Sequence, residues 1–584
     1  MFERRSPRLL AAGLATTLAV SAAVLTAPTS GAAPGARAAR GPKPVEVQLL
    51  ALNDFHGNLE PPTGSGGVTQ VGVDPTGTPV TVPSGGAEHL ATQLAQLAAQ
   101  QKRHNTITVA AGDLIGASPL LSAAFHDEPA IESLGLAGLD YASVGNHEFD
   151  EGAAELLRIQ GGGCHPVDGC ADGTPYEGAA FQYLSANAFV TETGEPLLPP
   201  YAIHQVQGVE VGFIGMTLEG TKAIVSQQGV AGLDFADEAD TANRYAAELR
   251  AQGVEAIVVL LHEGGSQTGT DAYQINGCNG LAGPIVELAA RMDPSIDVVV
   301  SGHTHQAYNC ELSGKLVTSA SSFGRLVTDI DLRIDRRSGD VLTAVADNVI
   351  VTRDLARDPA QSALIARYRE ALGPLAAEVV GSTSTELTRA QETLYGTVRG
   401  ESSLGNVIAD AQLAATDDEQ GAVAAFMNPG GVRADLDAGP VTYEEAFTVQ
   451  PFGNNLVTLD LTGAQLQCLL EQQLQVARTL SPSSTVSYVV DPAGTPAAAG
   501  ADPCTGGVVV DDSVTIGGVP VAPSSTYRIT VNSFLAGGGD GFTVLRSGTN
   551  AVTGVIDLDA LTDHLGARSP LAAPTEDRIR IAGG

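Results

Sequence analysis

The chain has 584 residues, of which 43% are hydrophobic and 17% are charged, which excludes a disordered protein and supplies apolar material for more than one domain. Its formal net charge is −35, from 31 Lys and Arg against 66 Asp and Glu. A surface of this charge repels the nucleic-acid backbone, so we expect no nucleic-acid polymer among its partners. A small anionic substrate would need a local positive site, made by metal ions or by Arg side chains.

The first 40 residues have the pattern of a secretory signal peptide. Arg4, Arg5 and Arg8 precede an apolar stretch at residues 9–25, and Ala36 and Ala38 fit a cleavage site. A membrane anchor is the alternative, but this stretch is short for a membrane span and rich in Ala and Thr. The C-terminus carries no hydrophobic tail. We therefore expect a secreted, extracellular protein that has no membrane anchor after the signal is removed.

From residue 45 to about residue 352, short β-rich runs alternate with longer segments. The predicted strands are residues 45–52, 106–111, 141–144, 209–214, 256–261 and 296–301. Most of them are continuously apolar, which is typical of strands covered on both faces. A helix is predicted over 88–102, where Leu90, Leu94 and Leu97 recur at helical spacing, and the Gly-rich and Pro-rich residues 64–86 are predicted to form a surface loop.

The second half of the chain begins with a lone amphipathic helix, predicted over 358–372 and ended by Gly373 and Pro374. A second domain follows from about residue 379. Within it we predict a helix over 403–415, strands over 455–461, 486–490, 508–510 and 527–531, and a loop over 492–503.

Six cysteines follow the predicted signal peptide, which indicates disulfides. Pairing of nearest neighbours is the simplest arrangement, because each loop then stays inside one domain. It gives the pairs Cys164–Cys170, Cys278–Cys310 and Cys468–Cys504. A zinc cluster is the alternative, but the sequence has no pair of cysteines separated by two residues.

Polar side chains follow the predicted strands of the first half. They are Asp54, His56, Asp113, Asn146, His147, His262, His303 and His305. In an open α/β sheet the carboxyl ends of the strands share one edge, where ligands bind. One Asp or His after a strand is usually a cap or a structural residue. Five of the 11 histidines at such ends, each beside Gly or an acid, instead predict a common site.

These residue types suit two divalent metal ions. A carboxylate such as Asp113 can bridge two ions, while imidazoles and an amide oxygen complete the ligands, a set that favours Zn, Mn, Fe or Co over Ca. Such a pair would lower the pKa of a bridging water. His147 lies three residues before Asp150, and a His oriented by an Asp can protonate a leaving oxygen. The alternative is that His147 is a further metal ligand or a packing residue.

With these residues the sequence resembles the calcineurin-like metallophosphoesterases and, more closely, the 5′-nucleotidase / UDP-sugar hydrolase family. The resemblance rests on residues 53–58 (NDFHGN), 112–113 (GD), 145–150 (GNHEFD), His262 and 302–305 (GHTH) in the first half. In the second half it rests on 401–410 (ESSLGNVIAD), 428–433 (NPGGVR), 451–454 (PFGN) and 534–542 (FLAGGGDGF).

The resemblance implies an α/β fold in three parts. A four-layer α/β/β/α metallophosphatase domain would span residues 41–356, after a leader at 1–40. A linking helix would span 357–378, and a second α/β domain that binds substrate would span 379–584. The resemblance also implies two divalent ions and attack on the substrate by a hydroxide that bridges them.

The resemblance assigns roles to individual residues. One metal ion would take Asp54, His56, Asp113 and His305, and the other Asp113, Asn146, His262 and His303. His147 and Asp150 would form the catalytic dyad. Arg399 and Arg433 would hold phosphate, Asn428, Asn454 and Asp540 would contact phosphate or ribose, and Phe452 and Phe534 would stack on the base.

The expected function is that of a secreted 5′-nucleotidase that removes phosphate from extracellular nucleotides. UDP-sugars and 2′,3′-cyclic nucleotides are further candidate substrates. The alternatives are the same fold acting on another phosphoester or on a sulfur ester, and an inactive nucleotide-binding surface protein. Every expected ligand position is filled, which disfavours the inactive protein.

Overall fold

The computed structural model describes residues 43–62, 64–101, 105–225, 229–396, 398–498 and 500–582. The predicted signal peptide at 1–40 lies outside these residues. Residues 44–584 form one unit, which contains both halves of the chain discussed above. Within the described residues, no helix combines the length and the apolar character that a membrane crossing requires.

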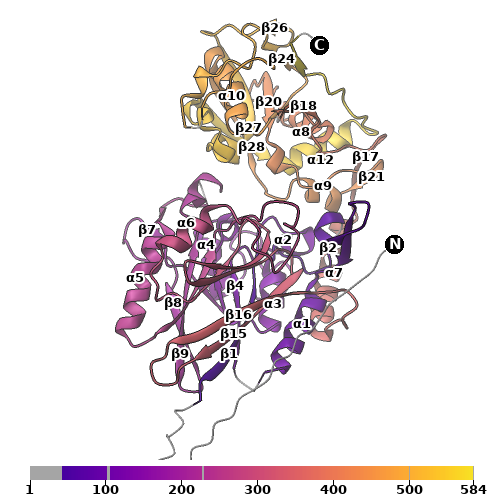
Figure 1. Ribbon diagram of the computed structural model, residues 1–584. Coiled ribbons are helices and arrows are strands. Elements are labelled where there is room, and N and C mark those ends of the chain that lie inside the picture. Colours follow the sequence, from indigo (N-terminus) through magenta and orange to yellow (C-terminus); the bar gives the residue numbers. More distant parts are fainter. Residues whose placement is uncertain are drawn as a thin grey trace, which may run out of the picture. The chain divides into compact units, whose positions relative to one another are not determined.

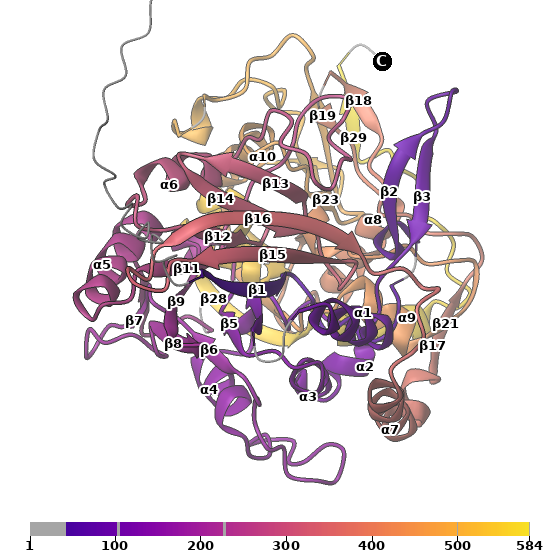
Figure 2. The same ribbon diagram turned by 60° about the horizontal axis from the view of Figure 1, so that its bottom comes forward.

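Two six-stranded sheets make up the first domain. The first has the order β16 (Val341–Ile350), β15 (Leu326–Ile334), β1 (Val45–Leu52), β4 (Thr106–Ala111), β5 (Tyr141–Ser143) and β6 (Gln182–Leu184). The second has the order β13 (Ala307–Leu312), β14 (Lys315–Ala320), β12 (Val298–Ser301), β11 (Ala256–His262), β9 (Val209–Thr217) and β8 (Tyr201–Val206). Figure 2 shows β16, β15 and β1 side by side.

The two sheets pack against each other and carry helices on their outer faces. In β1, Leu49 and Ala51 join the core that the two sheets share, whereas Leu50 and Leu52 join the core under the helices. The helices of the first sheet are α1 (Ala87–Ala99), α2 (Leu120–Ala123), α3 (Glu128–Leu136), α4 (Ala153–Gly161) and α7 (Pro359–Ala376). Those of the second are α5 (Glu238–Ala251) and α6 (Pro284–Arg291). The predicted four-layer α/β/β/α order is thereby confirmed.

The strands divide between two sheets, which the strand pattern by itself does not distinguish from one open sheet. Continuous apolar runs show that both faces of a strand are covered, but they do not say whether a helix or another sheet covers them. Within each sheet the strands that carry the candidate ligands are parallel, β1 with β4 and β5, and β11 with β12. Their carboxyl ends therefore still meet at one edge of each sheet.

The C-terminal domain, orange to yellow in Figure 1, is also mixed α/β. A five-stranded sheet has the order β23 (Ser481–Pro482), β20 (Ala424–Met427), β27 (Thr526–Asn532), β22 (Asn455–Thr462) and β28 (Thr549–Ile556). A smaller sheet has the order β26 (Val519–Pro520), β25 (Thr515–Ile516), β24 (Val486–Val490) and β29 (Ile579–Ile581). The helices are α8 (Ser403–Ala414), α9 (Tyr443–Val449), α10 (Gly463–Gln475), α11 (Ser533–Ala536) and α12 (Asp557–Ala567). Among the described residues, four two-stranded pairings remain. In the first domain they are β2 (Val68–Val73) with β3 (Pro79–Pro83) and β7 (Ala188–Val190) with β10 (Leu233–Phe235), and in the second domain β17 (Val379–Thr383) with β21 (Gly439–Thr442) and β18 (Thr393–Tyr395) with β19 (Val398–Arg399).

Three local predictions are wrong. Residues 64–86 contain a hairpin of β2 (Val68–Val73) and β3 (Pro79–Pro83), because Asp74 accepts backbone hydrogen bonds from Thr76 and Thr78 and closes the turn. Helix α7 continues past Gly373 and Pro374 to Ala376, although Pro374 cannot donate the intrahelical hydrogen bond at its position. Residues 508–510 form an isolated bridge, Val509 with Val490, and no regular strand, and the N–H groups of Val508 and Val509 donate to the Glu471 carboxylate.

The structure contains the three predicted disulfides, Cys164–Cys170, Cys278–Cys310 and Cys468–Cys504. We expect titration of the denatured, unreduced protein to find almost no free thiol, because all six cysteines are paired. Peptide mapping checks the partners. About two thiols per chain would show that one of the bridges is open in the isolated protein.

Candidate metal centre and adjoining pocket

The ends of five strands place the candidate ligands. Asp54 and His56 follow β1, Asp113 follows β4 and Asn146 follows β5, all in the first sheet. His262 is the last residue of β11, and His303 and His305 follow β12, in the second sheet. Because the sheets lie face to face, side chains from both meet at one edge.

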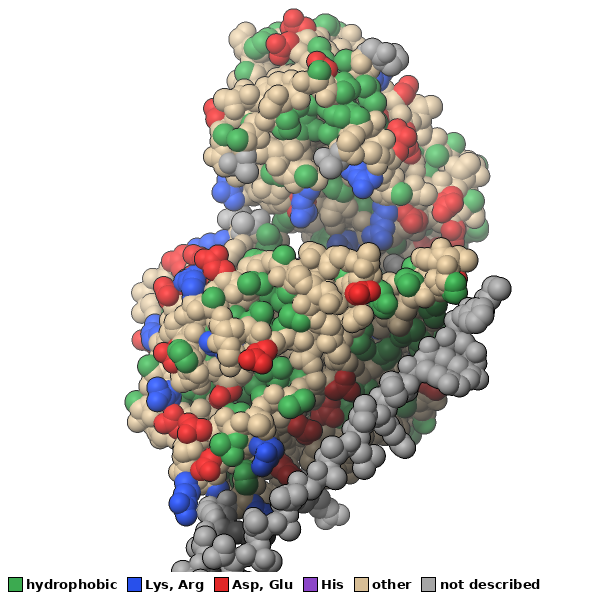
Figure 3. Space-filling model, in the orientation of Figure 1, with side chains coloured by type: hydrophobic (Ala, Val, Ile, Leu, Met, Phe, Trp, Pro, Cys, Tyr) green, Lys and Arg blue, Asp and Glu red, His purple; other side chains and the backbone are tan. Residues whose placement is uncertain are grey.

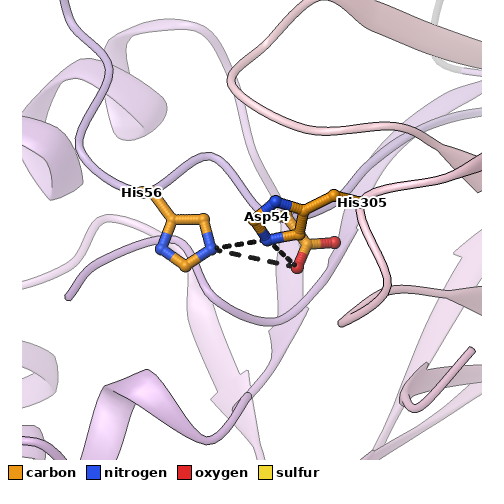
Figure 4. A group of neighbouring side chains, drawn as sticks. All are labelled: Asp54, His56 and His305. Atoms are coloured by element: carbon orange, nitrogen blue, oxygen red, sulfur yellow. Dashed lines mark hydrogen bonds and ion pairs between the residues drawn. The ribbon is translucent and has the colours of Figure 1, made fainter. Parts of the chain in front are cut away.

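The distances within the cluster define two overlapping groups. Nε2 of His305 lies 3.3 Å from Oδ1 of Asp54 and 3.1 Å from Nε2 of His56 (Figure 4). Nε2 of His262 lies 2.9 Å from Oδ2 of Asp113, and Nε2 of His56 lies 3.7 Å from the same oxygen. The ligand atoms of Asp54, His56 and His305 lie within 4.8 Å of one another, as do those of Asp113, His262 and His303. Asp113 therefore contacts both groups.

Hydrogen bonds from two imidazoles determine which ring nitrogens face the cluster. Nδ1 of His262 is 2.7 Å from the carbonyl of Ala111, and Nδ1 of His56 is 2.8 Å from the carbonyl of Gly116. A carbonyl only accepts, so both Nδ1 atoms carry the proton. When the ring is neutral, Nε2 then carries a lone pair that is directed at a carboxylate oxygen or at another imidazole. Such an arrangement of acceptors requires a cation between them, either a proton on Nε2 or a metal ion, and a hydrogen bond from Nδ1 of this kind commonly orients metal-binding His.

Oδ1 of Asn146 is buried and has no hydrogen-bond partner among the described residues. Nε2 of His262 is also buried and faces Oδ2 of Asp113 at 2.9 Å, a contact that is favourable only when a proton or a metal ion lies between the two atoms. A buried polar atom without a partner is destabilising unless something else binds it. Imidazole nitrogen, carboxylate oxygen and amide oxygen together are a donor set that Zn, Mn, Fe and Co accept. The residues present therefore fit divalent metal ions.

Charge coupling inside the cluster is strong. Burial opposes the charged form of His262, but the neighbouring Asp113 carboxylate outweighs it and raises the pKa of the imidazole to about 10. Burial lowers the pKa of His56 to about 3 and that of His303 to about 4. Against the effect of burial, His262 and His147 hold the pKa of Asp113 well below its ordinary value. A proton on His262 thus balances the Asp113 charge that a metal ion would otherwise balance.

The backbone is strained at most of the candidate ligands. Asp54, His56, Asp113, His303 and His305 all have positive φ, between 47° and 69°. Side-chain-bearing residues rarely adopt this conformation, and strained residues concentrate at functional sites. Each of these turns directs a side chain back across the end of its strand, toward the cluster.

His147 and Asp150 form the predicted pair. Nδ1 of His147 lies 2.7 Å from Oδ2 of Asp150. His147 begins the short 3₁₀ turn His147–Phe149, and Asp150 is the residue that follows this turn. Burial opposes protonation, but the carboxylates of Asp150 and Asp113 raise the pKa of His147 to about 9. Gly116 packs against the pair so closely that a Cβ there would lie 2.6 Å from Cβ of His147 and 2.9 Å from Oδ2 of Asp150.

Glu148 is a structural element of the site that the sequence analysis missed. Its buried carboxylate accepts from the backbone N–H of Asp113 (3.0 Å), Leu114 (2.8 Å) and Gly145 (2.5 Å). Burial, together with the charge of Asp113, raises the pKa of Glu148 to about 7. Glu148 thereby joins the loops after β4 and β5. The signal in the sequence that could have identified Glu148 was the presence of an acidic residue inside the GNHEFD motif.

A pocket of about 310 Å³ adjoins the cluster and contains residues from both domains. Ten of the predicted site residues line this pocket. The first domain contributes Asn146, His147, Asp150 and His303, and the second domain contributes Asn428, Arg433, Phe452, Asn454, Phe534 and Asp540. The Phe452 ring is stacked on His147, with centroids 6.0 Å apart and planes 14° apart, and the Arg433 guanidinium lies 5.6 Å from the Phe452 centroid. Candidate metal ligands and candidate substrate-binding residues therefore share one cavity.

Arg399 lies outside this pocket. It ends β19 (Val398–Arg399), where its guanidinium donates to Oγ1 of Thr393 over 2.6 Å. Two other arginines are close to the predicted residues. Arg389 donates to the carbonyl of Arg433 over 2.9 Å, and Arg478 lines the pocket and forms an ion pair with Asp540. Figure 3 shows several Lys and Arg side chains gathered along one edge of the C-terminal domain.

Comparisons with known proteins agree with this architecture. The family described as "Calcineurin-like phosphoesterase" matches residues 47–307, and the family described as "5'-nucleotidase, C-terminal domain" matches residues 379–547. The crystal structure of a 5′-nucleotidase precursor from Thermus thermophilus is similar over 92% of this chain and 100% of its own, with 27% identity and a TM-score of 0.67.

Two curated relatives are more similar in sequence. "Endonuclease YhcR" of Bacillus subtilis is 34% identical over 546 residues, which are 92% of this chain but 41% of YhcR. "Cell wall protein Lmo0130" of Listeria monocytogenes is 32% identical over 600 residues, 96% of this chain and 70% of Lmo0130. The chain thus spans less than half the length of YhcR.

Two facing sheets with clustered His and Asp at their strand ends, followed by a matching second domain, define the class of the protein. It is a metal-dependent phosphoesterase, an enzyme that hydrolyses phosphoesters. Since both halves match in order and a relative agrees over most of its length, the chain belongs to the 5′-nucleotidase family.

Proposed function

We propose that the protein is a secreted 5′-nucleotidase that removes phosphate from extracellular nucleotides. One observation carries the proposal: a single pocket contains metal-cluster residues, two phenylalanines and an arginine. A phosphate near the cluster would place the rest of the nucleotide beside aromatic rings able to stack on a base. A general phosphatase has no need of the aromatic part of this pocket.

The ligand sets follow the two groups in the cluster. Asp54, His56, Asp113 and His305 would hold one divalent ion, and Asp113, Asn146, His262 and His303 the other. Zn, Mn, Co and Fe suit these donors. When bound, such ions stabilise charge on phosphoryl oxygens and lower the pKa of a coordinated water.

The remaining residues would bind and orient the nucleotide. Arg433 would pair with the phosphate, and Asn428, Asn454 and Asp540 would contact phosphate or ribose. The His147 imidazolium, held by Asp150, would donate a proton to the leaving oxygen from Nε2, because Nδ1 is engaged with the carboxylate. Phe452 and Phe534 would stack on the base.

Export and domain boundaries belong to the same proposal. Three disulfides favour an oxidising compartment, and one relative is named a cell wall protein. We place the metallophosphatase domain at residues 41–356, the linking helix at 357–378 and the substrate-binding domain at 379–584. The ends of α7, at Pro359 and Ala376, support the position of the linker.

A phosphate-release screen tests the function. The chelated protein is given Mn, Zn, Co or Fe and then nucleoside monophosphates, nucleoside diphosphates, 2′,3′-cyclic nucleotides, UDP-sugars and a single-stranded oligonucleotide. We expect release from nucleoside 5′-monophosphates that depends on added metal. Activity confined to the oligonucleotide, or to non-nucleotide esters, would contradict the proposal.

Replacing both Phe452 and Phe534 with Ala should lower kcat/KM for nucleoside monophosphates by tens-fold. Stacking on an aromatic ring contributes roughly 1–3 kcal/mol per base in nucleic-acid binding sites, and every base has a π-face, so broad base tolerance is expected in the wild type. Para-nitrophenyl phosphate serves as the control substrate and should be affected less. Equal losses on both substrates would show that the rings support the fold and do not read the base.

A further inference from the structure

Arg478 and Asp540 form an ion pair on the wall of the pocket, away from the metal cluster's own acids. Asp540 has φ 55° and is nearly buried, and its Oδ1 accepts from Arg478. Its other oxygen, Oδ2, accepts from Nδ2 of Asn428 over 2.9 Å, and Oδ1 of Asn428 accepts in turn from Asn532 over 3.0 Å. Both oxygens of Asp540 are therefore already hydrogen-bonded inside the protein.

Arg478 retains free donors. A guanidinium has five N–H groups, and among the described residues the Arg478 side chain donates only to Asp540. Half of the side chain is exposed, at 50%, and it lines the pocket. The buried Gln473 fixes the backbone that carries it, because Gln473 accepts from the N–H of Arg478 through its carbonyl (2.9 Å) and from the N–H of Leu480 through Oε1 (3.1 Å).

The pocket therefore has two separate cationic positions. Nη1 of Arg433 lies 3.4 Å from the carbonyl of Gly430, and Nη1 of Arg478 lies 3.7 Å from the position that a Cβ on Gly430 would take. The two arginines thus flank the same turn. Asp150 and Asp540 are the carboxylates among the described residues that line the pocket, and each is paired, with His147 and Arg478 respectively. Neither would leave an uncompensated negative charge facing an anionic ligand.

We infer that Arg478 is a specificity-determining residue that binds a second phosphate, carried on the 2′ or 3′ oxygen of the ribose. The inference rests on the proposed nucleotidase function, in which Arg433 pairs with the 5′-phosphate that is hydrolysed. A ribose held beside Asp540 and Asn428 brings its 2′ and 3′ oxygens to the Arg478 side of the turn. The preferred substrates are then nucleoside bisphosphates, from which water releases the 5′-phosphate and leaves the 2′- or 3′-phosphate in place.

Steady-state kinetics on the full-length, metal-loaded enzyme test this inference. Adenosine 5′-monophosphate is compared with adenosine 3′,5′-bisphosphate and adenosine 2′,5′-bisphosphate. One of the bisphosphates should have a kcat/KM about tenfold or more above that of the monophosphate, mainly through a lower KM, since a charge-assisted hydrogen bond contributes energy of this order. Whichever bisphosphate is favoured identifies the oxygen that carries the second phosphate.

Arg478→Gln should lower the ratio of bisphosphate to monophosphate kcat/KM by about tenfold, and Arg478→Lys should restore part of it. Arg546→Gln is the matched control, because Arg546 supports the same glycine-rich loop through the carbonyl of Gly537 but does not line the pocket. That control should leave the ratio unchanged.

Two results would overturn the inference. One is a wild-type enzyme that hydrolyses the monophosphate but does not favour either bisphosphate. The other is an equal loss on all three substrates in Arg478→Gln, which would show that the ion pair only supports the loop. Both leave the nucleotidase function intact, whereas a wild type inactive on all three substrates would contradict the proposed function itself.

Discussion

Asp113→Ala should abolish phosphoester hydrolysis and remove most of the bound metal. The Asp113 carboxylate lies 2.9 Å from Nε2 of His262 and 3.7 Å from Nε2 of His56, so it connects the two ligand groups. Loss of a residue that only orients a ligand costs roughly 10–100-fold in affinity or activity, and loss of a shared ligand should exceed that. Elemental analysis of the purified variant, beside the rate of phosphate release, measures both effects.

Two further variants separate loss of metal from loss of fold. Asp113→Asn keeps the shape of the side chain and should also lose metal and activity. Asp140→Asn is the matched control: Asp140 accepts from the N–H of Thr108 near the start of the same strand, β4, and lies away from the cluster. It should keep its metal. Two equivalents of metal still bound to Asp113→Ala would overturn the assignment of Asp113 as the shared ligand.

His147→Ala should lower kcat by ~10²–10⁴, the range typical of a general acid or base, with little change in metal content. Nδ1 of His147 is engaged with Asp150 at 2.7 Å, which leaves Nε2 free to protonate a leaving group. Asp150→Ala should reduce kcat in the same direction but by less, because the imidazole remains and only its orientation is lost. Two measurements on the same preparations check these expectations: the rate at saturating nucleotide and the metal content.

The competing interpretation of His147 gives a different result. One of its ring nitrogens lies within 4.8 Å of the ligand atoms of His56 and Asp113, close enough for a metal ligand. If His147 binds metal, His147→Ala should lose metal in step with activity, and added Mn or Zn should restore part of the rate. Loss of activity at full metal content supports the proton donor instead.

Much of the candidate metal centre could be predicted because its signals are local in the sequence. An apolar run followed by Asp, Asn or His places a polar group at the carboxyl end of a strand, as at β1 and β4. The disulfide pairing could be predicted for a similar reason, since cysteines close together in the sequence can form a bridge within one domain. The strand bounds at Val45–Leu52 and Thr106–Ala111 likewise follow from uninterrupted apolar residues.

Other features depend on contacts between residues far apart in the chain. Val508 to Val510 has the composition of a strand, but the Glu471 carboxylate takes two of its N–H groups. Arg399 stands beside a family motif, yet its guanidinium binds Thr393 outside the pocket. Arg478 lies in no motif that the sequence analysis used, and its importance appears only when Asp540, 62 residues further along, is beside it.

The sequence by itself determined which residues could form the centre: apolar strands, a set of His, Asp and Asn at their ends, and aromatic residues in a second half that matches the same family. Only the tertiary structure decided that these strands form two facing sheets, that the Nδ1 protons of His56 and His262 point to carbonyls, and that Asp113 contacts both groups. The physical reason is that composition and periodicity indicate whether a residue is buried. The direction of a lone pair depends instead on which groups from distant parts of the chain pack against that residue.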